Sequence, residues 1–159
     1  MDEENFYPVY LLQENVAFPD PFFNEKRYHT GIFIETDPQS GTGAFHHVTG
    51  DIVSVQGMKY EVRPMSSPPE SSEAFHAKTK LGRVRREDYP ATFDEKLRGI
   101  PPPIRQRIFN PRTMTLEQCK LDGTLYMPGE SKPPYEKCTE WTNLKAIPAL
   151  IEARILIES

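Results

Sequence analysis

The stretch Tyr28-His29-Thr30-Gly31-Ile32-Phe33-Ile34 decides the fold, because it joins a β-like apolar run to a histidine at its start. A cluster of turn-forming residues follows at 36–43, and Ala44-Phe45-His46-His47-Val48 continues as a second β-like run. Two such runs joined by turn formers predict a β-hairpin. We therefore expect antiparallel strands over 28–35 and 44–48.

The neighbouring segments extend this hairpin into a larger sheet. Residues 8–13 predict a strand before it, and 52–55 and 58–62 alternate well enough to predict one or two more after it. The first 65 residues thus predict an antiparallel meander of four or five strands.

The second half of the chain carries the helical patterns. Thr92-Phe93-Asp94-Glu95 has the form of a capping box and predicts a short helix through Leu97. Apolar residues recur at helical spacing between 141 and 151, interrupted by Pro148, which predicts one helix over 139–146 and another over 148–157. We expect one α+β domain over 1–159, with a sheet of four to six strands and two to four short helices.

Two segments between these patterns lack regular periodicity. The run 101–103 is three prolines and predicts polyproline II, either a rigid spacer or a docking site for a partner. Residues 109–136 contain several turn formers, and a segment this long without regular structure is usually functional or mobile.

The composition limits the classes of function. A chain of 159 residues with a net charge of −4 lacks the basic footprint of nucleic-acid-binding proteins. No apolar run reaches the length of about 20 residues that spans a bilayer, and the acidic N-terminus differs from a signal peptide. Two cysteines, Cys119 and Cys138, are too few for a disulfide framework, so we expect a cytoplasmic protein with free thiols.

A short basic run lies around the strand-like segment 81–84. Its cationic residues are Lys78, Lys80, Arg83, Arg85 and Arg86. Such a run indicates either a solvated face with ion pairs or a surface for an acidic ligand or partner.

Cys138, in Lys137-Cys138-Thr139-Glu140-Trp141, is the candidate nucleophile. A thiol at a helix start lies where unpaired backbone N–H groups and the helix dipole favour negative charge, and Lys137 adds a cation. Thiols in such positions have pKa values of roughly 3.5–7.5. The alternative is that Cys138 is a small buried hydrophobic residue, as many free cysteines are.

The candidate base is His29, at the start of the first strand of the hairpin. Successive side chains on a strand face opposite sides, so only one of His46 and His47 shares a face with His29. A zinc site formed by His29, one of these two histidines and Cys138 is an alternative without supporting spacing motifs. The sequence implies no metal, nucleotide or flavin cofactor.

The order of these parts resembles the circularly permuted NlpC/P60 papain-like superfamily, with its lecithin:retinol acyltransferase-like and PPPDE-type members. The chain is also similar to a group of small fungal proteins with a Tyr-His strand, a Gly-rich turn leading to a histidine, and a late Cys-x-x-Trp. The resemblance implies Cys138 as nucleophile, His29 as base and His47 as the orienting group, with His46 as the second choice. Trp141 matches the aromatic residue three positions after the cysteine, whereas Lys137 stands where family members commonly carry Asn.

These observations predict a cysteine-dependent hydrolase or acyltransferase acting on an amide, ester or thioester of a small molecule or peptide. We expect Phe22, Phe23 and Trp141 to bind substrate, in a cleft bordered by the loop 18–23 and the segment 110–136. The alternative is a non-catalytic binding protein of the same fold, with the aromatic loop or the run 101–103 as its contact surface.

Overall fold

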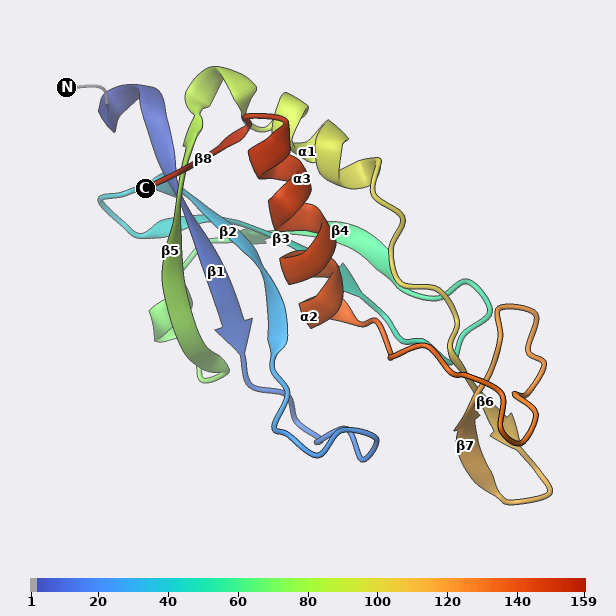
Figure 1. Cartoon of the computed structure of the whole chain (residues 1–159). Helices are drawn as coiled ribbons and strands as arrows, with labels where there is room; N and C mark the ends of the chain where they lie inside the picture. Colours follow the sequence, from blue (N-terminus) through green and yellow to red (C-terminus); the bar gives the residue numbers. More distant parts are fainter. Residues whose placement is uncertain (1–2) are drawn as a thin grey trace.

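The computed structural model describes residues 3–159, and its main feature is a six-stranded antiparallel sheet (Figure 1). The strand order is β4-β3-β2-β1-β5-β8. The strands are β1 (Phe6–Glu14), β2 (His29–Asp37), β3 (Thr42–Thr49), β4 (Lys59–Met65), β5 (Phe75–Arg85) and β8 (Leu156–Glu158). The strands β1 to β4 form a meander, while β5 pairs with β1 on its other side.

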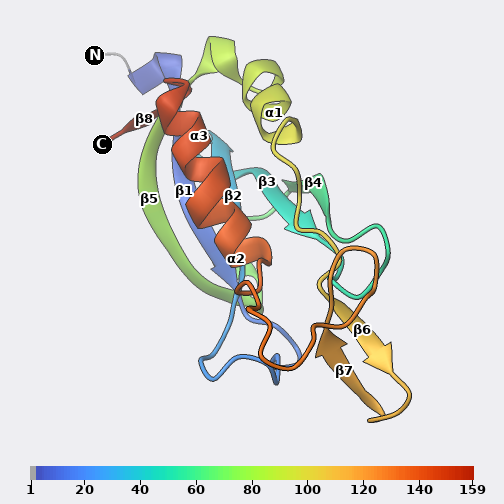
Figure 2. The same cartoon turned by 45° about the vertical axis from the view of Figure 1, so that its right-hand side comes forward.

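One long helical segment crosses one face of this sheet (Figure 2). It begins with α2 (Cys138–Glu140), continues as the π-helical η4 (Trp141–Ala146) and ends with α3 (Ile147–Glu152). A second helix, α1 (Ala91–Arg98), packs near α3, and three short 3₁₀ turns lie at η1 (Glu3–Asn5), η2 (Pro69–Ser71) and η3 (Arg86–Asp88).

A two-stranded hairpin, β6 (Arg107–Asn110) and β7 (Thr115–Gln118), projects from the body (Figures 1 and 2). Within residues 3–159, no helix is both long and apolar enough to cross a lipid bilayer.

The two faces of the sheet have different surroundings because successive residues of a strand point to opposite sides. Ile32, Ile34 and Val48 face the helices and join the main core around Trp141. Phe33 and Phe45 point to the other face, where they pack with Leu12 in a smaller cluster. The face that carries this smaller cluster, opposite the long helical segment, is called the open face below.

The structure confirms an antiparallel sheet with few short helices and corrects several boundaries. Residues 52–55 form bends and turns instead of a strand, and the segment 109–136 contains most of the hairpin β6–β7. The helix expected over 148–157 ends at Glu152, after which the chain forms β8 against β5.

Pro148 does not separate two helices. Its missing N–H would leave a gap in a regular α-helix, but the preceding π-helical turns change the hydrogen-bond register, and the N–H of Ile147 bonds to the carbonyl of Thr142. The helix α1 begins at Ala91 after Pro90, so Thr92 is not its cap.

The proline run 101–103 is held to the body through its carbonyl groups. The carbonyl of Pro101 accepts a hydrogen bond from Trp141 Nε1 at 3.2 Å, and that of Pro103 accepts one from the N–H of Met58 at 2.9 Å. This run is therefore a packed connection, which favours the spacer role over docking.

His46 lies on the helix side in a buried polar network. Its Nδ1 is 2.6 Å from the Tyr60 hydroxyl, and its Nε2 is 2.8 Å from the Tyr89 hydroxyl. Because Tyr60 donates its proton to Asp94 at 2.8 Å, it accepts from His46 Nδ1–H, and in the neutral ring Nε2 accepts from Tyr89. Both nitrogens of the imidazole are thus satisfied in the neutral form, which burial favours.

This network predicts a pH-dependent stability. Burial lowers the pKa of His46 from 6.5 to about 4. The contribution of neutral His46 to the free energy of unfolding is therefore complete above pH 6.5 and is lost as the pH falls toward 4. At ~1.4 kcal/mol per pKa unit, the loss is about 3 kcal/mol. Urea unfolding between pH 7 and 4 should show a smaller loss in His46→Gln than in wild type. The exposed control His76→Gln should retain the wild-type dependence, and an unchanged dependence in His46→Gln would contradict this role.

Candidate active site

The start of the long helical segment docks on the first residues of β2. The hydroxyl of Thr142 donates to the carbonyl of Thr30 at 3.2 Å, and the hydroxyl of Thr139 donates to the carbonyl of Tyr28 at 3.4 Å. The pairing of β3 with β2 runs from Ile32 to Asp37, so the helix start takes the place of a strand partner at residues 28–30. This docking sets Cys138 beside the start of β2.

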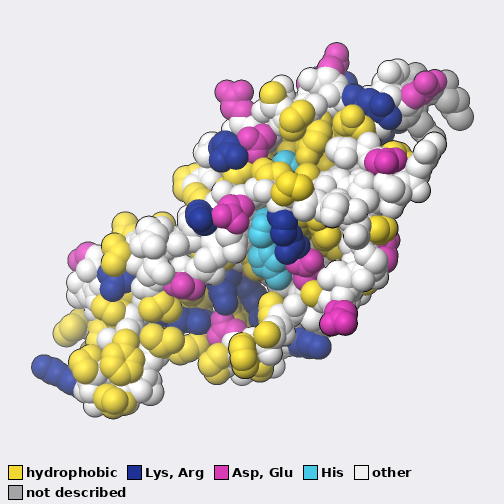
Figure 3. All heavy atoms as spheres, turned by 180° about the vertical axis from the view of Figure 1, so that it is seen from behind, with side chains coloured by type: hydrophobic (Ala, Val, Ile, Leu, Met, Phe, Trp, Pro, Cys, Tyr) yellow, Lys and Arg dark blue, Asp and Glu magenta, His cyan; other side chains and the backbone are white. Residues whose placement is uncertain are grey.

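His29 and His47 form a close pair on the open face. His29 Nε2 lies 2.7 Å from His47 Nδ1, with the two rings nearly perpendicular. Phe45 stacks on His47 with a centroid distance of 4.6 Å and presents its edge toward His29. Histidine side chains reach the surface in the middle of the face drawn in Figure 3, among acidic and basic groups.

Gly31 provides the room for this arrangement. A Cβ at position 31 would lie 2.6 Å from Phe45 Cε1, inside the van der Waals contact distance. The glycine between His29 and the apolar run therefore lets the Phe45 ring lie against both histidines.

The Cys138 thiol is 8% exposed, belongs to the main core cluster, and donates a long hydrogen bond to the carbonyl of Tyr28, 3.9 Å away. Its burial opposes ionisation, but hydrogen bonding to His29 and the charge of that ring outweigh burial and lower the pKa of the thiol. The backbone N–H of Thr30 and the side chain of Thr139 lower it further. Cys138 therefore occupies a site that favours the thiolate form.

The second histidine of the pair, His47, is neutral at physiological pH. Burial, followed by the charge of His29, lowers the pKa of His47 to about 4. The contact between the two rings occupies Nε2 of His29, so Nδ1 is the nitrogen of that ring that remains for the thiol. His47 Nε2 is buried without a hydrogen-bond partner among the described residues.

Ion pairs tie the loop 15–28 to the residues around Cys138. Arg27 forms a bidentate pair with Glu140 at 2.6 and 2.7 Å. Asp20 accepts from Lys137 at 2.8 Å and from Arg107 at 3.2 Å. The Lys137 side chain thus holds the loop, and we call these contacts the loop clasp.

The aromatic residues predicted to bind substrate have different positions. Phe22 and Phe23 pack their ring edges against Tyr135, and Phe22 also covers the Arg107 guanidinium at 3.9 Å. Phe22 and Tyr135 border a cavity of about 280 Å³ against β7, at the boundary predicted between the loop and the 110–136 segment. Trp141 is fully buried in the main core, so the structure gives it a core role instead of the predicted substrate contact.

The remaining candidates do not join the site. His46 is held by Tyr60 and Tyr89 on the opposite side of the sheet. Cys119 is buried as a free thiol on the projecting hairpin, and burial raises its pKa. Across residues 3–159, no group of three His, Cys, Asp or Glu side chains gathers as a metal site requires.

Several contributing residues were missed by sequence reasoning. Thr139, Thr142 and Thr30 carry the docking of the helix, and their spacing gives no signal for a contact 109–112 residues away. Arg27 and Asp20 were also missed. Glu140 did offer a signal, because an acidic residue three positions after a helix start typically accepts from the backbone there, as it does from Lys137 N–H at 2.8 Å.

Gly31→Ala should disrupt the histidine pair. The added methyl group would push Phe45 away from His47 and change the 2.7 Å contact. We expect histidine ring NMR signals of positions 29 and 47 to shift while those of His76 remain. Gly99→Ala, whose Cβ would meet its nearest atom at 3.5 Å, is the matched control. Unchanged signals in Gly31→Ala would show that the glycine has no such role.

Comparisons with known proteins give one finding. No curated protein and no solved structure matches the chain. One family profile, described as a family of unknown function (DUF6540), matches residues 10–157, which include the loop 15–28, the whole of β2 and the helix start. The chain therefore belongs to the DUF6540 family.

Proposed function

We propose that this protein is a cysteine-dependent hydrolase or acyltransferase acting on an amide, ester or thioester. The observation that carries the proposal is the docking of the helix start that bears Cys138 on residues 28–30, beside the His29–His47 pair with its 2.7 Å contact. Hydrogen bonding to His29 also lowers the pKa of the thiol. A nucleophile, a base and a group that orients the base are the three parts that covalent acyl transfer requires.

The chemistry follows from the atoms available. The Cys138 sulfur attacks the carbonyl carbon while its proton resides on His29 Nδ1. The bond to the leaving group then breaks, and His29 returns the proton to that group. Water or an acceptor next attacks the thioester, gives its proton to His29 and releases Cys138. The N–H groups at the helix start, which lack intrahelical partners, would stabilise the oxyanion.

The arrangement also supports the permuted papain-like assignment. The histidine strand precedes the cysteine helix in the chain, and the second histidine comes from the neighbouring strand, as in the NlpC/P60 superfamily. The superfamily commonly carries Asn where this chain has Lys137. This difference has a local explanation, because the ion pair between Lys137 and Asp20 neutralises the lysine and holds the loop 15–28.

Access to the thiol requires movement. Because Cys138 is only 8% exposed, a substrate carbonyl reaches the sulfur only if a neighbouring segment of the protein moves. We infer that the loop 15–28 moves, since the clasp ties it to Lys137 and Glu140 on either side of the cysteine.

One observation favours the alternative of a non-catalytic binding protein. Large apolar side chains are exposed along the hairpin β6–β7 and the loop that follows it, residues 107–130, which we call the projecting segment: Phe109, Met114, Leu121 and Met127. Hydrophobic side chains gather on this projecting part in Figure 3. Exposed apolar patches commonly mark interaction surfaces, so this segment is the contact surface if the thiol is inert.

The pH dependence of alkylation separates the two functions. We expect Cys138, followed by peptide mass spectrometry during iodoacetamide treatment, to titrate well below ~8.5, the value of a free thiol. His29→Ala removes the hydrogen bond and the charge and should raise that midpoint by at least one pH unit. His76→Ala, an exposed histidine, should leave it unchanged. Equal midpoints in wild type and His29→Ala would remove the activated nucleophile.

Weakening the loop clasp should expose the thiol. In Asp20→Asn the pairs with Lys137 and Arg107 are lost, and we expect Cys138 alkylation to accelerate several-fold. The limiting rate at high pH, where the thiol is fully ionised, reports access independently of its pKa. Glu130→Gln, which breaks the 2.8 Å pair with Lys120 on the projecting segment, is the control. The same limiting rate in Asp20→Asn and wild type would rule out the loop as the barrier.

A further inference from the structure

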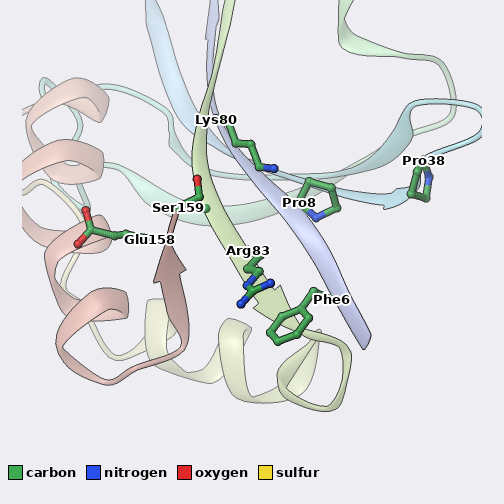
Figure 4. A pocket seen from close by; sticks show the side chains of 8 residues that line it. Phe6, Pro8, Pro38, Lys80, Arg83, Glu158 and Ser159 are labelled. Carbon is green, nitrogen blue, oxygen red and sulfur yellow. The ribbon is translucent and has the colours of Figure 1, made fainter. Parts of the chain in front are cut away.

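A second site lies at the far end of the sheet from Cys138. A pocket of about 450 Å³ opens between β1, β5 and the end of β8 (Figure 4). Its apolar walls are Phe6, Pro8 and Pro38, and its charged residues are Lys80, Arg83 and Glu158. Gly82 and Ser159 complete the lining. This volume falls in the range of small-molecule sites, which combine apolar walls with a few polar groups.

A β-bulge puts the two cations of this pocket on one face. Residues three apart on a regular strand point to opposite sides, so Lys80 and Arg83 would be separated. In β5, however, Lys80 pairs with Tyr10 and Gly82 pairs with Val9, which leaves Leu81 as an extra residue. Arg83 then pairs with Pro8, two residues from Tyr10, and both cations point to the open face. Bulges of this kind redirect side chains and often occur beside functional sites.

Gly82 makes this geometry possible. A Cβ at position 82 would lie 2.0 Å from the carbonyl oxygen of Ile157 in β8. The glycine therefore lets β8 pair closely at the bulge, and β8 forms one border of the pocket.

The two cations of the pocket lack the ion pairs that neighbouring cations of β5 form. Lys78 forms ion pairs with Glu35 and Glu70, and Arg85 pairs with Asp88. Among residues 3–159, by contrast, no carboxylate lies within ion-pair distance of Lys80 or Arg83. Figure 4 shows the Glu158 side chain directed away from Arg83 and Lys80, to the other side of β5.

Arg83 is also held in a defined orientation. Its guanidinium lies 4.1 Å from the centre of the Phe6 ring, an arrangement that fixes the plane of the group and leaves its N–H edges available. A guanidinium presented in this way binds a carboxylate through two parallel hydrogen bonds. Lys80, whose strand position is about 7 Å away, supplies a second charge.

We propose that this pocket binds an organic acid with a compact apolar body. The carboxylate lies between Lys80 and Arg83, and the apolar body contacts Phe6, Pro8 and Pro38. The site is independent of the Cys138 chemistry, because it lies at the opposite end of β1 from Glu14, which pairs with His29.

The test uses naphthalene-2-carboxylate and the uncharged naphthalene-2-carboxamide as probes, with backbone amide NMR of the full chain. We expect the acid to shift the signals of residues 6, 80, 82 and 83, with an affinity that falls as salt is added. The amide should bind at least tenfold more weakly. Shifts confined to other regions, or equal affinities for acid and amide, would overturn the proposal.

A charge-matched pair of variants isolates the two cations. Lys80→Gln with Arg83→Gln should weaken binding of the acid at least tenfold. Lys59→Gln with Arg112→Gln removes the same charge at two exposed positions elsewhere and should leave binding unchanged. Equal weakening in both double variants would overturn the proposal. If the first variant does not fold, the comparison of acid and amide on the wild-type chain decides the question.

Discussion

The docking of the helix start on the first residues of β2 is the contact on which the candidate site depends. Thr142 and Thr30 are both fully buried, and the hydroxyl of one satisfies the carbonyl of the other. A buried carbonyl left without a partner costs ~1–3 kcal/mol, so this contact strongly favours a single position for the helix. That position sets a thiol from the end of the chain beside a histidine from its beginning.

Successive residues of a strand face opposite sides of the sheet, which places the two histidines of β3 in different environments. His46 and His47 are adjacent in sequence, yet one belongs to a buried tyrosine network and the other to the pair with His29. Burial lowers the pKa of both histidines to about 4, but the neutral rings have different partners. Neutral His46 completes the buried tyrosine network, whereas neutral His47 contacts His29, and hydrogen bonding to His29 lowers the pKa of the Cys138 thiol.

Part of this could be predicted from the sequence, and the reasons for the rest are physical. The β2–β3 hairpin and the helix after Cys138 have strong local patterns, and alternation correctly limits the partner of His29 to one of two residues. The strand β5 is mostly polar and contains a bulge, so its periodicity is broken. The clasp of Asp20 with Lys137 joins residues 117 positions apart, and local pattern carries no information about such a pair.

Acylation of Cys138 tests the central claim most directly. After brief exposure to p-nitrophenyl acetate and acid quenching, peptide mass spectrometry should find one acetyl group on Cys138 in wild type. That group should disappear on standing as the thioester hydrolyses, and His29→Ala should carry little of it. Acetylation of Cys119 or of lysines with none on Cys138, or equal acetylation of Cys138 in His29→Ala, would contradict a Cys138–His29–His47 catalytic unit.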